Sequence, residues 1–325
     1  MRFALAVLLL FGLTPVGIGA NRQKPAPPTY DPGEVNNSSQ PVPKVKKGAP
    51  ILRAQILLSR AGFSAGELDG AAAKNFSATL RAFQESKSLQ PTGTLNEETW
   101  TALNADPGPV VIPYTLTAED VSGPYEPVPD DMMEMAKLKR VNYASVEEAL
   151  AEKFHVSVPV LQSLNQGKKF EAGTEIMVAD TTRPAAAKVQ RLVVTKSPSA
   201  VMALDESGKV VRFYVASSGS EHDPLPVGEW KITAIVRDPP FHYNPELFWD
   251  ADAGHSKAKI PPGPNNPVGA VWLDLTKDHY GIHGTPNPAT VGHAQSHGCI
   301  RLTNWDVLEL ADLVTKDMPV IMRER

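Results

Sequence analysis

The sequence has a single cysteine, Cys299, in 325 residues. One cysteine cannot form an intramolecular disulfide, so the chain is not a disulfide-stapled scaffold. Its thiol is therefore reactive, cross-linked to another chain, or buried as a small apolar group. The position of Cys299 between Gly298 and Arg301, with His297 two residues away, favours a reactive thiol over an inert one.

Positive charge is not in excess either. The 32 Lys and Arg residues are opposed by 36 Asp and Glu, which gives a formal net charge of −4. Because proteins that bind nucleic acid carry a basic patch to neutralise phosphates, this balance excludes nucleic acid as a partner. The length and the 42% of hydrophobic residues are enough for two or three domains, each with its own core.

Long hydrophobic runs are lacking. The longest, residues 4–13, follows Arg2, is closed by Pro15, and is shorter than the roughly 20 residues that a membrane span needs. With the small residues that follow it, this pattern predicts a secretory signal peptide over residues 1–20, and an uncleaved anchor is the alternative. We therefore expect an exported protein in the periplasm or cell envelope that meets the membrane only through this transient segment.

Two segments have the composition of connections rather than of domains. Residues 21–50 are rich in Pro, Asn, Ser, Gln and Lys and have scarcely any large apolar side chains, so they predict an extended linker that builds no core. In residues 107–140 prolines recur and hydrophobic periodicity fades, which predicts a connector.

Residues 51–106 contain three short helical patterns. Phe76, Leu80 and Phe83 repeat at i, i+4 and i+7, and Asn96 has the side chain of a helix N-cap. We expect a small three-helix domain here.

Residues 141–180 predict a second small module. Ser145 and Glu148 form a capping-box pattern before one helix, and Ser157 starts another. An apolar strand follows at residues 175–178, whereas the strand expected at the start of the range is poorly marked. The order is therefore strand, two helices and a closing strand.

After a short linker, residues 190–325 become β-rich. Strand-length apolar runs lie at residues 192–195, 201–204, 210–215 and 230–236. The one long helical pattern begins at Asn304, which we expect to be its N-cap. The sequence thus predicts a multidomain α+β protein whose last domain is a β-rich sandwich with one main helix.

The residues capable of chemistry gather in this last domain. Cysteine attacks as a thiolate and needs a neighbouring base or cation, and His283 and His297 are the nearest candidates for the base. The residue pattern alone does not separate these two histidines. Ser296 precedes His297, but adjacency in sequence does not aim a hydroxyl at the next ring, so Ser296 is a weak candidate nucleophile. Four histidines crowd residues 279–297, yet they form no helical pair of metal ligands spaced i, i+4 with a Glu between, so we expect no metal and no cofactor.

The motif His283-Gly284-Thr285, a short insert, and then Ser296-His297-Gly298-Cys299-Ile300-Arg301 resembles the signature of the L,D-transpeptidase catalytic domain. The resemblance extends from about Arg191 to the C-terminus. It implies a transferase that cross-links peptidoglycan in cell wall biogenesis and so contributes to cell shape, on a β-rich fold with one main helix.

The upstream modules carry resemblances of their own. Residues 51–106 are similar to peptidoglycan-binding domains in Gly62, Asp69-Gly70 and Gly93, although Ala71-Ala72-Ala73 replace an expected glycine. Residues 141–180 resemble a LysM-type glycan-binding module. Both modules would hold the enzyme on its polymeric substrate, and we expect the chemistry itself to be separable from them.

The family resemblance assigns Cys299 as the nucleophile and His283 as the base, oriented by the carbonyl of Gly284. The backbone amides of Gly298 and Cys299 are candidates for the oxyanion site. Arg301 would hold a substrate carboxylate or brace the loop. The supporting residues are His297, Gly298, Gly284, Ser296 and Arg301.

The implied reaction uses a stem tetrapeptide as donor and an amine of a neighbouring stem as acceptor, through a cysteine thioester. If water takes the thioester instead, the same site is an L,D-carboxypeptidase. An envelope protein that binds peptidoglycan through an inactive catalytic fold is the alternative from another class.

Overall fold

The computed structural model describes residues 29–325 except residues 38, 40, 41, 43, 107 and 294–297. The predicted signal peptide lies outside the described residues. Within the described ranges, no helix is both long enough and apolar enough to cross a membrane.

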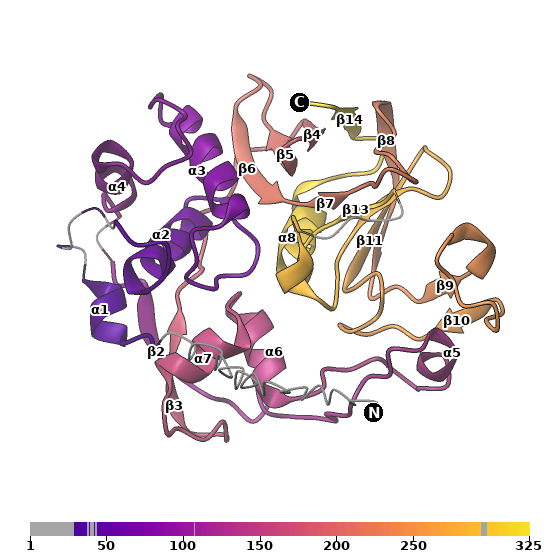
Figure 1. The fold of residues 1–325 in the computed structure, drawn as a ribbon, viewed down its shortest axis with the longest axis horizontal. Helices are drawn as coiled ribbons and strands as arrows, with labels where there is room; N and C mark the ends of the chain where they lie inside the picture. The colour runs from indigo at the N-terminus through magenta and orange to yellow at the C-terminus, as the bar shows by residue number, and fades with distance from the viewer. Residues whose placement is uncertain (1–28, 38, 40–41, 43, 107, 294–297) are drawn as a thin grey trace, which may run out of the picture.

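The C-terminal part is built on one curled sheet of ten strands, where the sequence predicted a sandwich (Figure 1). The order in the sheet is β1-β6-β5-β4-β14-β8-β11-β12-β13-β7. The strands of this domain are β4 (Arg191–Lys196), β5 (Ser199–Leu204), β6 (Val210–Val215), β7 (Ser217–Ser218), β8 (Gly228–Arg237), β11 (Val271–Leu275), β12 (Gly281–His283), β13 (Ile300–Arg301) and β14 (Pro319–Arg323).

The main helix of this domain, α8 (Asn304–Leu313), packs its apolar residues into the core of the sheet. Its N-cap is Thr303, whose hydroxyl accepts from the backbone N–H of Asp306, and not Asn304 as the sequence predicted. The shift by one residue places Asn304 in the first turn, where its amide is free to bond elsewhere.

The helical domain consists of α2 (Ala49–Arg60), α3 (Lys74–Ser86) and α4 (Glu97–Leu103). Three helices were expected in residues 51–106, and the first begins two residues earlier, inside the predicted linker. It also contains the short strand β1 (Phe63–Ser64), which pairs in parallel with β6. This domain therefore supplies an edge strand to the catalytic sheet.

The second module pairs β2 (Val111–Thr115) with β3 (Glu175–Ala179) in an antiparallel ribbon packed with α6 (Val146–Lys153) and α7 (Val158–Leu164). Its first strand comes from the range predicted as a connector and not from residue 141 onward. Pro113 within β2 weakens the strand pattern, and it is tolerated because a two-stranded ribbon has open edges.

Between β2 and α6 the chain makes a long excursion to the catalytic domain. The short helix α5 (Met132–Met135) lies on this path, beside the hairpin of β9 (Phe241–Tyr243) and β10 (Ala258–Ile260) (Figure 1). Met135, Val141, Tyr243 and Ile260 form a small buried cluster there. Two 3₁₀ turns, η1 (Pro245–Leu247) and η2 (Pro288–Thr290), complete the described elements.

Part of the predicted linker, residues 21–50, packs on the folded domains. Helix α1 (Pro32–Asn36) buries Val35, Tyr30 is 3% exposed, and the Asn36 oxygen accepts from the backbone N–H of Val110 at 2.8 Å. The expectation that this segment builds no core was wrong for residues 30–36, because two apolar side chains at a preformed surface are enough to dock a short helix.

Candidate active site

The site is organised by the parallel pairing of β12 with β13. Ile282 is in register with Ile300, and His283 is in register with Arg301. Both isoleucines are fully buried in the core. Because side chains alternate across a sheet, His283, Arg301 and Cys299, which directly precedes β13, share the opposite face. The pairing thus brings together two motifs separated in sequence.

His283 is held in a defined orientation. Its side chain is buried, it stacks on Trp272 with ring centroids 5.5 Å apart, and Nδ1 lies 2.6 Å from the carbonyl oxygen of Gly284. A carbonyl only accepts, so Nδ1 carries the hydrogen and Nε2 carries the lone pair. Burial and the charge of Arg301 lower the pKa of His283 to about 3. Hydrogen bonds to the backbone of Gly284 and Val268 act in the other direction, but they are outweighed. The imidazole is therefore neutral at neutral pH.

Cys299 is partly exposed, and its Sγ lies 3.6 Å from the carbonyl oxygen of His279. Burial raises the pKa of the thiol, while the backbone of Gly281 and the charge of Arg301 lower it. The cation that a reactive cysteine needs is present, but desolvation outweighs it. Both shifts favour the uncharged forms, a thiol at Cys299 and a neutral imidazole at His283.

The glycines of the motif are required by packing. Gly298 has a φ of +94°, and a Cβ there would lie 2.7 Å from the ring of Tyr280. A Cβ on Gly281 would lie 2.5 Å from Trp272. Sequence reasoning did not find Trp272 and Tyr280, because no local pattern marks an aromatic ring that must lie against a glycine.

Arg301 has a buried Nε with no hydrogen-bond partner among the described residues. Burial lowers the pKa of its guanidinium, and the neighbouring Cys299 opposes this. The part of the chain that the structure describes contains no carboxylate in an ion pair with Arg301.

The remaining expected residues are only partly placed. Gly284 lies in the site, whereas Ser296 and His297 fall outside the described residues. His293 is exposed on the loop before them. Among the residues described, no three His, Cys, Asp or Glu side chains gather as a metal site.

A second group reaches the site from the upstream module and was not found by sequence reasoning. Glu152 of α6 is 8% exposed and accepts from Asn304 Nδ2 at 2.9 Å and from the hydroxyl of Tyr143 at 3.0 Å. Burial raises the pKa of Glu152 to about 7, as do Glu148 and Glu67, while the bonds from Asn304 and Tyr143 lower it. In sequence, Glu152 is one of several glutamates on an amphipathic helix and carries no signal of its own.

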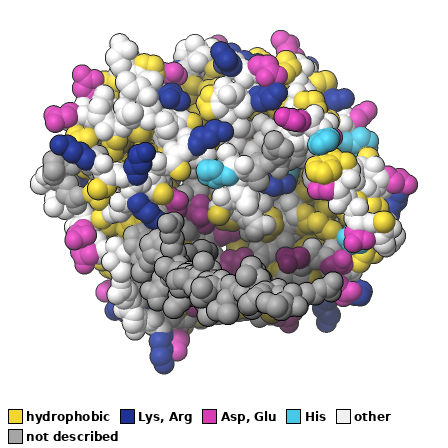
Figure 2. Space-filling view, viewed as in Figure 1, with side chains coloured by type: hydrophobic (Ala, Val, Ile, Leu, Met, Phe, Trp, Pro, Cys, Tyr) yellow, Lys and Arg dark blue, Asp and Glu magenta, His cyan; other side chains and the backbone are white. Residues whose placement is uncertain are grey.

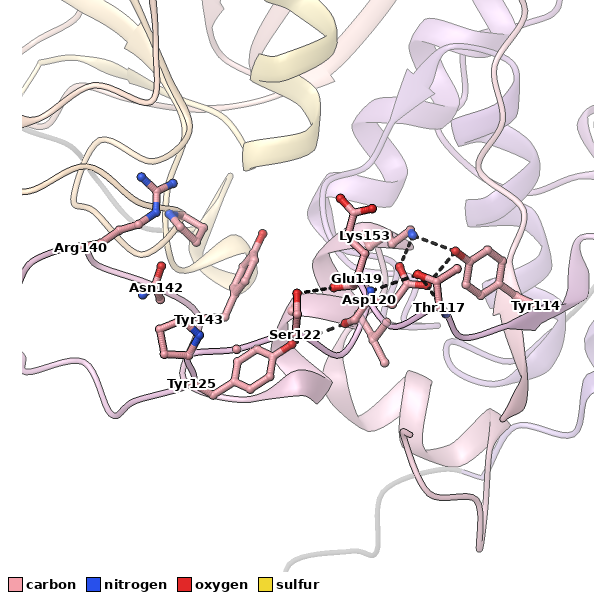
Figure 3. A pocket seen from close by; sticks show the side chains of 15 residues that line it. Tyr114, Thr117, Glu119, Asp120, Ser122, Tyr125, Arg140, Asn142, Tyr143 and Lys153 are labelled. Carbon is pink, nitrogen blue, oxygen red and sulfur yellow. Dashed lines mark hydrogen bonds and ion pairs between the residues drawn. The ribbon is translucent and has the colours of Figure 1, made fainter. Parts of the chain in front are cut away.

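A cavity of about 580 Å³ lies beside this module (Figure 3). The tyrosines Tyr114, Tyr125 and Tyr143 line it together with polar groups, and Pro264 is its one lining residue from the catalytic domain. Lys153 on its wall is neutralised by Asp120. Neither Cys299 nor His283 is among the residues that line this cavity, so it is distinct from the surroundings of Cys299.

On the face of the molecule shown in Figure 2, Lys and Arg side chains are interspersed with Asp and Glu. The aromatic side chains of residues 241–249 lie in two different settings. Phe241, Tyr243 and Phe248 pack together beside α5, whereas Trp249 is 63% exposed and its ring contacts His222.

Comparison with known proteins identifies two domains. Residues 190–322 match the family model of the L,D-transpeptidase catalytic domain, and residues 47–103 match that of the "Putative peptidoglycan binding domain". A Bacillus licheniformis protein named "Putative L,D-transpeptidase YkuD" is 62% identical over 53 residues, which are 16% of this chain and 32% of that protein. The match thus spans about a third of that relative. The Bacillus subtilis protein of the same name is 29% identical over 177 residues, which are 54% of this chain and 92% of that protein.

Among solved structures, an L,D-transpeptidase from Mycobacterium smegmatis is 20% identical, covers 50% of this chain and 78% of its own, and has a TM-score of 0.33. Residues 190–322, which contain the motif on β12 and β13, thus match the L,D-transpeptidase catalytic domain, and they follow a region that matches a putative peptidoglycan-binding domain.

Proposed function

We propose that the whole chain is an exported L,D-transpeptidase of the cell envelope, in which Cys299 is the nucleophile and His283 the general base. The observation that carries this proposal is the register of β12 and β13, which sets both side chains on one face of the sheet. His283 has the tautomer that the role needs, because Gly284 occupies its Nδ1 and leaves Nε2 to accept a proton.

The first half-reaction acylates the enzyme. As Cys299 Sγ forms a bond to the carbonyl carbon of the L,D peptide bond, its proton moves to His283 Nε2. The oxyanion is stabilised by backbone N–H groups at Gly298 and Cys299. When the C–N bond breaks, His283 returns the proton to the leaving amine of the terminal D-amino acid, and a thioester remains.

In the second half-reaction the amine of a neighbouring stem attacks the thioester. His283 takes a proton from this amine and delivers it to the departing sulfur, which restores the thiol and leaves a new amide cross-link. The raised pKa of Cys299 and the lowered pKa of His283 support a step in which the proton moves as the sulfur attacks.

The guanidinium of Arg301, which has no carboxylate partner among the described side chains, is proposed to bind a carboxylate of the stem. Ser296 and His297 are proposed to shape the loop before the nucleophile.

The upstream parts are proposed to bind the wall. The match of residues 47–103 supports this role for the helical domain. For the LysM-like module, support comes from the packing of α6 and α7 with the paired strands β2 and β3, between which α5 lies on the excursion. Further support comes from the cavity lined by tyrosine rings and polar groups, which suits a sugar with apolar faces and many hydroxyls (Figure 3). The proposed domains keep the sequence boundaries, except that β2 joins the LysM-like module.

The test is incubation with purified disaccharide-tetrapeptide fragments, read by mass spectrometry. A cross-linked dimer with release of a D-amino acid supports transpeptidation. A tripeptide without a dimer would assign the site to an L,D-carboxypeptidase, and no product would favour an inactive binding protein.

Two variants separate the catalytic roles. Cys299→Ser should abolish product while wall binding remains, because a serine hydroxyl is a weak substitute for the thiol. His283→Ala should slow acylation by about 10² to 10⁴-fold, as for other general bases. Full activity of Cys299→Ser would refute the cysteine mechanism.

A further inference from the structure

Asn304 lies directly behind the backbone that orients His283. Its side chain is 1% exposed, and Oδ1 accepts from the backbone N–H of Ala270 at 2.9 Å. The same oxygen would be 2.2 Å from a Cβ at Gly284 and 2.1 Å from a Cβ at Gly269. Asn304 therefore fills the space between these two glycines, one of which provides the carbonyl that binds His283 Nδ1.

The position of Asn304 is held from its other side by Glu152. The backbone N–H of Ala270 is a donor, so only the oxygen of the amide can face it, and the NH₂ group points away. Glu152 accepts from Nδ2 at 2.9 and 3.2 Å, and the carbonyl of Pro264 accepts from the same nitrogen at 3.0 Å. These two acceptors hold the NH₂ group and, with it, the oxygen against Ala270 and the two glycines.

Glu152 comes from α6 of the upstream module, whereas every other member of this chain of contacts belongs to the catalytic domain. We propose that Glu152 is a positioning residue of the active site, which acts through Asn304 and the Gly284 backbone to hold His283 in its catalytic orientation. This inference rests on the proposed function in giving His283 its role.

The backbone around Glu152 supports the same reading. The carbonyl of Pro262 accepts from the N–H of Val141 at 3.0 Å, and the carbonyl of Val141 accepts from the N–H of Asn265 at 3.1 Å. A Cβ on Gly263 would lie 2.1 Å from the oxygen of Val141. The backbone at Val141, before α6, is therefore hydrogen-bonded and in close contact with the loop of residues 262–265, which leads to Gly269. The module is seated closely enough to fix a side chain at the site.

A structural brace and a positioning residue predict different results. Loss of a brace lowers stability and leaves the kinetics of the folded enzyme unchanged. Loss of a positioning residue lowers kcat in protein that is still folded, because a misplaced base spoils proton transfer while substrate contacts remain. Displacements of about 1 Å at a catalytic group can cost about 10²-fold in rate.

The experiment compares Glu152→Ala, Glu152→Asp and Glu152→Gln in the full chain, with Glu147→Gln as a control on the same helix. We expect Glu152→Ala and Glu152→Asp to lower kcat on tetrapeptide fragments by about 10- to 100-fold with KM within about twofold. Asp is one methylene too short to reach Nδ2. Glu152→Gln should retain kcat within about threefold, because its amide oxygen still accepts from Asn304. Glu147→Gln should match the wild type.

The readout independent of turnover is the proton NMR signal of His283 Nδ1–H, assigned by its loss in His283→Ala. We expect it to shift or broaden in the Ala and Asp variants and to persist in Glu152→Gln. An unchanged signal in folded Asp and Ala variants, or unchanged kcat in both, would overturn the proposal. If the wild type does not turn over peptidoglycan fragments, the proposed function fails, while this signal still tests the positioning of His283. If Glu152→Ala does not fold, Glu152→Asp provides the same comparison with a smaller cavity.

Discussion

Removing the guanidinium of Arg183 should destabilise the whole chain far more than the loss of a surface charge would. Arg183 lies on the segment between the module and the catalytic domain, and its side chain is 8% exposed. It contacts Asp306 at 3.3 Å, the hydroxyl of Ser59 at 3.0 Å, and Glu309. Asp306 is fully buried in α8, where it also accepts from Ser64 at 2.6 Å. One cation therefore joins the helical domain, the linker and the catalytic helix.

The magnitude follows from the burial of Asp306. Burial raises the pKa of this carboxyl and Arg183 opposes the rise, so Arg183→Met leaves a buried carboxylate short of its countercharge. Breaking a buried pair in this way costs about 3–5 kcal/mol, a large part of the 5–15 kcal/mol that stabilises a typical protein. Urea unfolding measures the loss. The double variant Arg183→Met, Asp306→Asn should recover much of it, because a neutral amide needs no countercharge.

The control is Arg237→Met, which breaks an exposed ion pair with Asp312. Surface pairs are worth about 0–1 kcal/mol, so this variant should unfold almost as the wild type does. Equal losses for Arg183→Met and Arg237→Met, or a loss below about 1 kcal/mol for the buried pair, would refute the reasoning.

The other predictions concern pH and domain separability. The pKa of Glu152 is raised to about 7, so the folded state binds more protons than the unfolded state, and the free energy of unfolding should fall by about 3 kcal/mol as pH rises from about 4.5 to above 7. Glu152→Gln should not show this part of the fall when the free energy of unfolding is measured with urea at pH 5 and pH 8. If the wild type and Glu152→Gln lost the same free energy of unfolding between these two pH values, the prediction would be wrong. The raised pKa of Cys299 predicts that iodoacetamide labels it with a pH midpoint above that of free cysteine, so fast labelling at pH 6 would show a preformed thiolate. Deleting residues 29–188 should abolish turnover of soluble fragments as well as of sacculi, because the deletion removes Glu152, Arg183 and β1. Full activity of the truncated protein on soluble fragments would mean that the upstream parts serve only to attach the enzyme to the wall.

Local patterns predicted the elements that depend on local physics. Residues 210–215 were expected as a strand from their apolar run and form β6, and Ser145 caps α6 as its spacing with Glu148 indicated. Apolar runs and helix caps depend on residues that are only a few positions apart, so both can be predicted from a single sequence.

What the sequence did not predict depends on partners far away in the chain. Strand β1 has two residues and exists because β6 offers its edge. Strand β2 contains Pro113, and its partner β3 begins 60 residues after it. Neither has a periodicity that could mark it without the partner.

The candidate site divides in the same way. Residue chemistry alone identified Cys299 and two histidines, and the choice of His283 came from family resemblance. The register of β12 and β13 supplies a physical reason, because it places His283 and Cys299 on one face. Asn304 was noticed only as a helix cap, since nothing within its own segment reveals Glu152 as its partner.

The expectation that the chemistry is separable from the upstream modules assumed that a site is complete when its nucleophile and base are present. In this chain His283 contacts the carbonyl of Gly284, the space behind Gly284 is filled by Asn304, and the amide of Asn304 donates to Glu152 from α6. Burying a carboxylate costs free energy, and the pKa of Glu152 is raised by burial for the same reason. Such a group stays buried only where neighbouring donors bond to it, as Asn304 and Tyr143 do here. Docking of the module therefore bears on His283, and a ligand that moves Tyr143 in the tyrosine-lined cavity would act on Glu152 directly.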